Sequence, residues 1–111
     1  MYHFASEAVD RLFDAILLLR SREECYAFFD DVCTIKEIRD MSQRLEAACL
    51  LDKGTSYQRI SEQAGVSAAT ISRVSRCLNY GSGGYRQVIA RLAEAGKLND
   101  GRANGESADG K

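Results

Sequence analysis

The feature that most narrows the fold of this chain is the spacing of its apolar residues. Val9, Leu12 and Ile16 stand three, four and seven positions apart, which is the spacing of one face of an α-helix, and similar patterns recur as far as Leu92. No segment has the pattern of a strand. The sequence also contains no proline, so nothing forces a break in a long helix. We therefore expect an all-α protein.

Capping signals and glycines divide this pattern into six helices. Ser21 with Glu24, and Thr34 with Glu37, are capping-box pairs that start the second and third helices. Gly54 is placed to end the third helix. The expected helices are, approximately, Glu7–Arg20, Ser21–Asp31, Thr34–Lys53, Ser56–Ala64, Ser67–Leu78 and Tyr85–Gly96.

The length of 111 residues is that of one domain with one modest core, which we expect to span residues 1–95. Residues 96–111 are rich in Gly, Asn, Asp and Ser, which predicts a disordered polar tail. The first three helices carry more apolar surface than a chain of this size can easily enclose. An obligate homodimer would bury those faces, although the core of a helical bundle could use the same residues.

Positive charge is concentrated in one part of the chain. Residues 1–53 carry seven Lys and Arg against eleven Asp and Glu, whereas residues 54–92 carry five arginines against Glu62 alone. A protein that binds a polyanion through one face needs local positive charge and not a positive total. This distribution favours nucleic-acid binding through residues 54–92, although a pI of about 5.8 argues against strong non-specific affinity.

The cysteines point to a reducing compartment. Cys25, Cys33, Cys49 and Cys77 form no C-x-x-C pair, and each falls in an apolar helical context, so we expect buried, reduced thiols and a cytoplasmic protein. No apolar run approaches the ~20 residues of a membrane span, and no secretion signal is evident at the N-terminus.

Catalysis and metal binding have little support in the sequence. The one histidine, His3, lies near the N-terminus, and Cys77 has no histidine close to it in the sequence. Asp30 and Asp31 are adjacent, so on a helix they point about 100° apart. The cysteine spacings of 8, 16 and 28 do not match the paired ligands of a zinc module. We therefore expect no enzyme, no metal site and no cofactor.

Between Ser56 and Leu78 the sequence predicts a helix-turn-helix, which is two short helices joined by a tight turn. Gly65 would form the turn, where a side chain would clash or force an unfavourable positive φ. Ser61 is small where the two helices must approach. A simple corner between two helices with a solvated Ser and Arg face is the alternative. The core expected to lock the pair is Ile60, Ala64, Val66, Ile71 and Val74.

The outward side of the second of these helices carries small residues, hydroxyls and arginines, which is typical of a recognition helix in the major groove of DNA. Alanine and threonine methyl groups can contact thymine methyls, hydroxyls can bond bases or phosphates, and arginine can pair with guanine. The residues expected to face bases are Ser67, Ala68, Ala69, Thr70, Ser72 and Arg73. Those expected to contact phosphate are Gln58, Arg59 and Arg76.

The segments "MSQRLEAACLLDKG" and "ISEQAGVSAATISRVSRCLNYG" resemble the Trp repressor superfamily, and more narrowly its YerC/YecD branch of Trp-repressor-like proteins. The resemblance covers roughly residues 6–95 and is most distinctive in "TISRVSRCLNYG". It implies a six-helix, intertwined homodimer. It also implies that the fourth and fifth helices of each chain read double-stranded DNA as a transcriptional regulator.

Some members of that superfamily bind tryptophan between their core and their reading head, and part of that site matches this sequence. Thr34 and Arg44 match the polar contacts, and Arg73 matches the arginine on which the indole packs. Val74 stands where those members carry glycine, so its side chain would occupy space that the ring needs. We therefore expect that tryptophan is not the corepressor, and that Arg44 pairs with a neighbouring carboxylate. The sequence does not identify any other small molecule that could act as an effector.

A protein-interaction module is the alternative function. In that case the aromatic second helix, with Tyr26, Phe28 and Phe29, would bind another regulator, and the helix-turn-helix would be only structural. The two phenylalanines fit the core of a dimer better than a surface for a partner. An interaction module should tolerate alanine at Arg73 and Arg76, whereas a DNA-binding protein should lose affinity.

Overall fold

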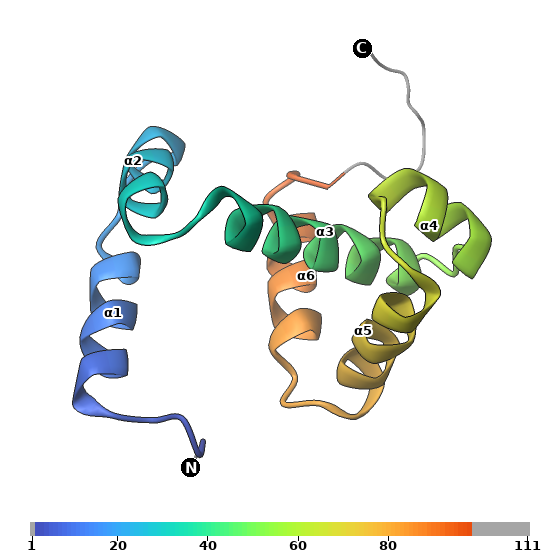
Figure 1. The fold of residues 1–111 in the computed structure, drawn as a ribbon, viewed down its shortest axis with the longest axis horizontal. Coiled ribbons are helices and arrows are strands. Elements are labelled where there is room, and N and C mark those ends of the chain that lie inside the picture. Colours follow the sequence, from blue (N-terminus) through green and yellow to red (C-terminus); the bar gives the residue numbers. More distant parts are fainter. Residues whose placement is uncertain (1, 99–111) are drawn as a thin grey trace. The chain divides into compact units, whose positions relative to one another are not determined.

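The computed structural model describes residues 2–98 of the chain (Figure 1). These residues form six α-helices and no strand, so the expected all-α, six-helix fold is confirmed. The helices are α1 (Glu7–Leu17), α2 (Arg22–Val32), α3 (Ile35–Asp52), α4 (Tyr57–Ala64), α5 (Ala68–Tyr80) and α6 (Gly84–Glu94).

The chain divides into two compact units, and the boundary between them falls inside α3. The first unit is residues 1–40, and the second begins at Met41. The single domain expected over residues 1–95 stays a prediction. The expected polar tail, residues 96–111, lies mostly outside the described residues.

Hydroxyl side chains cap five of the six helices at their N-terminal ends. In four of them a serine Oγ accepts a hydrogen bond of 3.1 to 3.3 Å from the N–H three residues further along. Before α3, Thr34 Oγ1 accepts from the N–H of Glu37 at 3.1 Å, and Glu37 Oε1 accepts from the N–H of Thr34 at 2.8 Å. These bonds satisfy N–H groups that have no partner within the helix. The capping serines are Ser6, Ser21, Ser56 and Ser67.

Two helices end earlier than the sequence predicts. α1 ends at Leu17 and not at Arg20, because the next two N–H groups donate to carbonyls three positions back at 3.1 Å each, and such tighter turns are common at helix ends. The backbone is then extended at Ser21, which caps α2 and prevents one helix from continuing into the next. α6 ends at Glu94, because Gly96 has a positive φ of 71°.

α5 is longer than predicted, because it runs to Tyr80 and does not end at Leu78. The expected turn from Asn79 to Gly84 is therefore reduced to residues 81–83. Asn79 Nδ2 donates to the carbonyl oxygen of Ser75, four residues back, at 2.9 Å, and this bond stabilises the additional helical residues.

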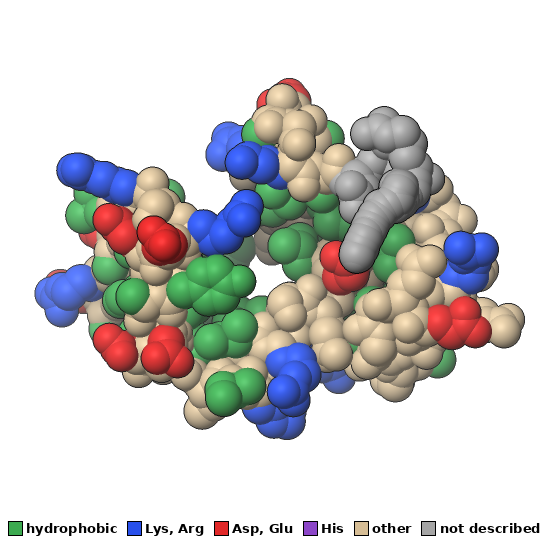
Figure 2. Space-filling model, turned by 90° about the horizontal axis from the view of Figure 1, so that it is seen from above, with side chains coloured by type: hydrophobic (Ala, Val, Ile, Leu, Met, Phe, Trp, Pro, Cys, Tyr) green, Lys and Arg blue, Asp and Glu red, His purple; other side chains and the backbone are tan. Residues whose placement is uncertain are grey.

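Helices α1 and α2 bury no residue within this chain. Leu17 and Leu18 are 80% and 73% exposed, and Tyr26 is 74% exposed. Figure 2 shows apolar side chains open to solvent at the left, where α1 and α2 lie in Figure 1. Phe28 and Phe29 are half-buried and pack edge to face, with 5.6 Å between ring centroids. The first unit therefore leaves uncovered the kind of apolar surface that marks contact with another molecule.

The hydrophobic core lies in the second unit, where α3 packs its C-terminal half against the three helices that follow. Ala47 and Ala48 are fully buried. Ile60 and Ile71 are the largest side chains that are completely buried. The core residues are Ala47, Ala48, Cys49, Leu50, Ile60, Ala64, Ile71, Val74, Leu78 and Ile89.

The expectation that all four cysteines are buried is wrong. Cys49 is buried and Cys33 is half-buried, but Cys25 and Cys77 are exposed, and all four are free thiols. Cys25 lies on α2, which buries nothing, and Cys77 faces an open hollow on the surface. An apolar context in the sequence does not establish burial where nothing covers that side of the helix.

The described helices include none that is both long and apolar enough to cross a bilayer. Within residues 2–98, no three His, Cys, Asp or Glu side chains lie close enough to one another to hold a metal ion.

Candidate nucleic-acid interface

Helices α4 and α5 are joined by a three-residue turn, residues 65–67, and stand at an angle to each other (Figure 1). Gly65 has φ 70° and ψ 34°, a left-handed conformation that glycine adopts at little cost. A Cβ there would lie 3.4 Å from Gln43 Nε2, an ordinary contact, so the positive φ and not lack of space requires glycine. The two short helices and the glycine turn expected over residues 56–78 are therefore present, and their role as a helix-turn-helix stays a prediction.

Ser61 has a role that the sequence did not reveal. Its Oγ donates a hydrogen bond of 2.8 Å to the carbonyl oxygen of Val66, and its own carbonyl accepts from the N–H of Gly65 at 3.0 Å. These two bonds fix both sides of the turn. The pattern indicated only that Ser61 is small, because a hydroxyl that bonds a backbone atom five residues away cannot be distinguished from a solvated one.

The core expected between α4 and α5 is confirmed. Ile60, Ala64, Ile71 and Val74 are buried, and Val66 of the turn is packed against them. Since both helices are held by these contacts, the opposite side of α5 is left facing solvent.

The residues expected to face bases lie on that open side of α5 or at its start. Thr70 is half-buried and the other five are exposed. Gln58 and Arg59 are exposed on the first turn of α4, and Arg76 is exposed on α5. The exposed members of the set expected to face bases are Ser67, Ala68, Ala69, Ser72 and Arg73.

Three of these residues are cations without a partner in the described chain. The guanidinium groups of Arg59, Arg73 and Arg76 make no hydrogen bond or ion pair within residues 2–98. Glu62 is the one acidic residue between positions 54 and 92. An unpaired cation on an exposed helix is available for an external anion, and this is the electrostatic requirement for binding a phosphate backbone.

Ser67 is already engaged in capping α5. Its Oγ accepts from the N–H of Thr70 at 3.2 Å and donates to Thr70 Oγ1 at 3.1 Å. The N–H groups of Ala68 and Ala69 start the helix and have no acceptor within it. Backbone N–H groups in that position, at the positive end of the helix dipole, can bind an anion.

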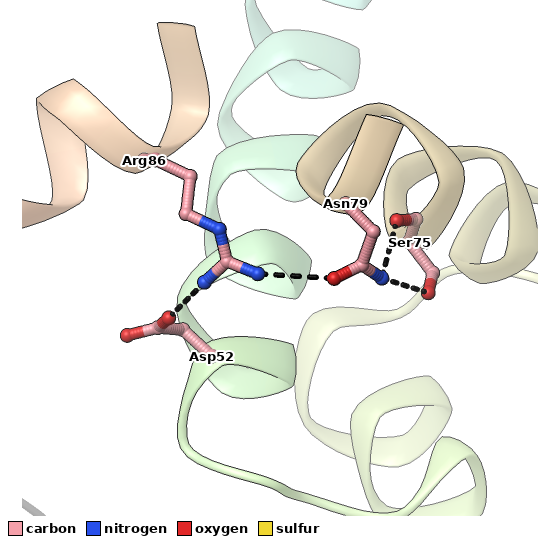
Figure 3. Close-up of polar contacts among 4 residues, drawn as sticks. All are labelled: Asp52, Ser75, Asn79 and Arg86. Carbon is pink, nitrogen blue, oxygen red and sulfur yellow. Dashed lines mark hydrogen bonds and ion pairs between the residues drawn. The ribbon is translucent and has the colours of Figure 1, made fainter. Parts of the chain in front are cut away.

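One arginine ties the end of α5 to α3 and α6 (Figure 3). Arg86 Nη1 donates to Asp52 Oδ1 at 2.8 Å, and Nη2 donates to Asn79 Oδ1 at 3.0 Å. Asn79 Nδ2 in turn donates to the carbonyl oxygen of Ser75 and lies 3.4 Å from Ser75 Oγ. We call these four residues the Arg86 clasp. The sequence alone does not show that Arg86 is paired, because its partner Asp52 is 34 residues away.

The residues matched to a tryptophan site are divided between the two units of the chain. Thr34 lies in the first unit and caps α3. Arg44 and Arg73 lie in the second unit, and both are exposed. The expected pairing of Arg44 with a carboxylate is not found within residues 2–98. Val74, where tryptophan-binding relatives are expected to have glycine, is 2% exposed and belongs to the core.

An open hollow of about 510 Å³ lies between Leu45 of α3, Cys77 of α5, and Tyr85 and Val88 of α6. Burial raises the pKa of the Tyr85 phenol, the nearby Cys77 thiol raises it further, and the positive charge of Arg44 lowers it. The hollow is mainly apolar, so it resembles a packing surface more than a site for a polar ligand.

Comparison with known proteins agrees with this arrangement. Residues 7–93 match the protein family described as Trp repressor protein. The chain is 52% identical over 86 residues to the uncharacterized protein YerC of Bacillus subtilis (strain 168). The aligned residues cover 78% of this chain and 83% of YerC.

Two crystal structures have the same fold. One is a candidate Trp repressor from Staphylococcus aureus, with a TM-score of 0.78 and 48% identity, covering 80% of this chain and 89% of that one. The other is a TrpR-like protein from Eubacterium eligens ATCC 27750, with a TM-score of 0.78 and 52% identity, covering 79% and 91% of the two chains. The chain belongs to the Trp repressor family.

Proposed function

We propose that this protein is a sequence-specific DNA-binding transcriptional regulator that inserts α5 into the major groove. The observation that carries the proposal is the open side of α5. It combines small side chains at the start of the helix with arginines that have no partner in the described chain, and it follows a turn built around Gly65. Small residues let a helix approach base edges closely, and arginine supplies both base and phosphate contacts.

The proposal gives the exposed residues different roles. Ala68, Ala69 and Ser72 lie nearest the bases, and Arg73 pairs with a guanine. Thr70 and Ser67 join them at the start of the helix, where the Ser67 hydroxyl also caps α5. The residues assigned to the phosphate backbone are Gln58, Arg59 and Arg76.

We further propose that the protein acts as a homodimer in the bacterial cytoplasm. The support is the uncovered apolar surface of α1 and α2, which two chains could bury against each other. A two-fold dimer would present two copies of α5, and regulators of that kind bind paired half-sites. Tryptophan is not assigned as an effector, since Val74 fills the position of the expected glycine.

The proposal is tested by selection of duplexes from a randomised DNA library, followed by fluorescence anisotropy. The best selected duplex and a scrambled control are titrated across a salt series, with and without tryptophan. Arg73→Ala should weaken the selected duplex by about 1–3 kcal/mol and relax its sequence preference, as a base contact does. Arg76→Ala should weaken both duplexes and reduce the salt slope by about one, as a phosphate contact does.

Arg91→Ala is the matched control, because it removes the same charge from an exposed position on α6, away from the helix-turn-helix. It should leave the preference between the two duplexes unchanged. Selection that enriches no sequence, together with unchanged binding by the Arg73 and Arg76 variants, would contradict the proposal. The protein-interaction role of α2 would then be the function to test.

A further inference from the structure

We propose that the Arg86 clasp is a positioning device, which holds α5 in the rotation that presents its open side to DNA. The inference rests on the proposed function. It assigns to Arg86 no contact with DNA, and it names an arginine outside the helix-turn-helix as a determinant of sequence preference.

The guanidinium group of Arg86 joins three helices because it donates from two nitrogen atoms at once. Nη1 reaches Asp52 at the end of α3, and Nη2 reaches Asn79 in the last turn of α5 (Figure 3). A planar fork of this kind fixes direction as well as distance, which the single ammonium of lysine cannot do.

The side chain of Asn79 is held on both sides. Its Oδ1 accepts from Arg86, and its Nδ2 donates to the carbonyl oxygen of Ser75. Turning the amide round would place a donor against the guanidinium and an acceptor against a carbonyl oxygen. The network therefore allows one orientation of the amide and connects the backbone of α5 directly to Arg86.

Asn79 lies on the same side of α5 as two of the residues proposed to face bases, Ala68 and Ser72. Ala68, Ser72, Ser75 and Asn79 are spaced by four, three and four residues, so they form one stripe along the helix. The clasp holds the last two members of that stripe. The first two members are exposed where the helix starts, so a rotation of α5 at its far end would turn them relative to the groove.

The charge of Arg86 is already matched by the Asp52 carboxylate at 2.8 Å. The two side chains are 51% and 39% exposed, so this pair contributes little to stability. Base contacts, in contrast, depend on geometry, since a site must be held within ~0.5 Å of its productive arrangement. We therefore expect the clasp to affect sequence preference more than folding or non-specific binding.

The test measures the affinity ratio between the selected duplex and its scrambled control, and the salt slope of each. Arg86→Met keeps the aliphatic part of the side chain and removes the fork. We expect it to lower the ratio about fivefold, with no change in the salt slope, because Arg86 does not contact phosphate. Arg91→Met, which removes the same charge from the same helix, should leave the ratio unchanged.

Two further variants separate positioning from charge. Arg86→Lys keeps the charge without the fork, so the ratio should stay low. Asn79→Ala removes the connection to α5 without altering any charge, and it should lower the ratio to a similar extent. Urea unfolding of each variant confirms that the protein is folded under the assay conditions.

Three other outcomes would each contradict a different part of the proposal. A salt slope that falls by about one in Arg86→Met would show that Arg86 binds phosphate directly. Ratios that stay at the parental value in Arg86→Met and Asn79→Ala would show that the clasp does not position α5. A parent protein with no preference between the duplexes would overturn the proposed function itself, and the parent is measured first so that the two failures are distinguished.

Discussion

At Val74 the packing of the core requires an apolar side chain, whereas a bound tryptophan ring would require glycine. Its side chain is 2% exposed in the core of the second unit. We expect Val74→Gly to lower the free energy of unfolding by about 2–4 kcal/mol, because a buried side chain is lost and glycine weakens a helix. Urea denaturation measures this, and Val74→Ala separates the packing part from the glycine part.

Calorimetric titration with tryptophan completes the test at this position. The parent protein should give no binding heat, because Val74 occupies the position where glycine is expected in tryptophan-binding relatives. If Val74→Gly is as stable as the parent, the assignment of Val74 to the core is wrong. If the parent itself binds tryptophan, then Val74 does not close the site.

Cys49 should make stability depend on pH in the alkaline range. Burial, followed by the nearby Glu46 carboxylate, raises the pKa of its thiol above the ordinary value. The folded chain therefore keeps the thiol protonated to a higher pH than the unfolded chain does. Thiols in unfolded chains ionise near pH 8.5. Below that pH the free energy of unfolding should keep its full value, and it should fall as the pH rises from there through the pKa of the folded state.

The measurement is a series of urea unfolding curves from pH 7 to about pH 10, where the raised pKa of Tyr85 begins to contribute in the same direction. We expect a decline of at most about 1.4 kcal/mol per pH unit, and Cys49→Ala should remove most of it. Cys25→Ala, at an exposed thiol, is the control and should keep the decline. A parent protein with equal stability across this range would rule out the effect.

At the scale of the secondary-structure elements, the turn between α4 and α5 depends on one backbone conformation. We expect Gly65→Ala to lower stability by about 1–2 kcal/mol, because a side chain at φ 70° is strained. Gly65→Asn should cost less, since asparagine tolerates this conformation better. Gly84→Ala is the control, because Gly84 lies in α6 without a positive φ and with open space around it. Equal effects of alanine at both positions, measured by thermal unfolding, would contradict this account of the turn.

The starts of the helices were predicted more closely than the ends of α1, α5 and α6, for a physical reason. A start depends on side chains within three residues, as Ser21 with Glu24 and Thr34 with Glu37 show. An end depends on how the chain continues. The two residues that α5 has beyond the predicted end are stabilised by the bond from the Asn79 amide to Ser75, and Arg86 holds that amide from another helix.

The candidate site also has features that the sequence predicted and features that it did not. Its buried side and its exposed arginines follow from helical periodicity and local charge, and both are found where the sequence placed them. The Arg86 clasp was missed, because it joins residues 34 positions apart through exposed side chains that leave no periodic signal. The exposure of Cys25 and Cys77 was missed because periodicity identifies an apolar face without identifying what covers it.

At the scale of the whole molecule, the apolar surface of the first unit is the feature that a single chain does not explain. Leu17 is 80% exposed and Phe13 is 47% exposed, one turn apart on α1. Surface of this kind is costly in water and is usually covered by another chain. We expect light scattering to give a mass twice the 12.3 kDa of one chain.

Substitution then distinguishes a dimer that buries α1 from one that forms elsewhere. If a partner chain covers this helix, Leu17→Asp or Phe13→Asp places a carboxylate in an apolar contact and should shift the mass towards that of one chain. The unfolding midpoint of the dimer should then depend on protein concentration. Gln63→Asp adds the same charge at an exposed polar position of α4 and should leave the mass at two chains. Should the parent have the mass of one chain, or the α1 variants keep two chains with parental stability, then α1 is not the contact. A surface substitution in a monomer changes stability by less than ~0.5 kcal/mol, so a larger loss in the two α1 variants is itself evidence that water does not reach these side chains in the assembled protein.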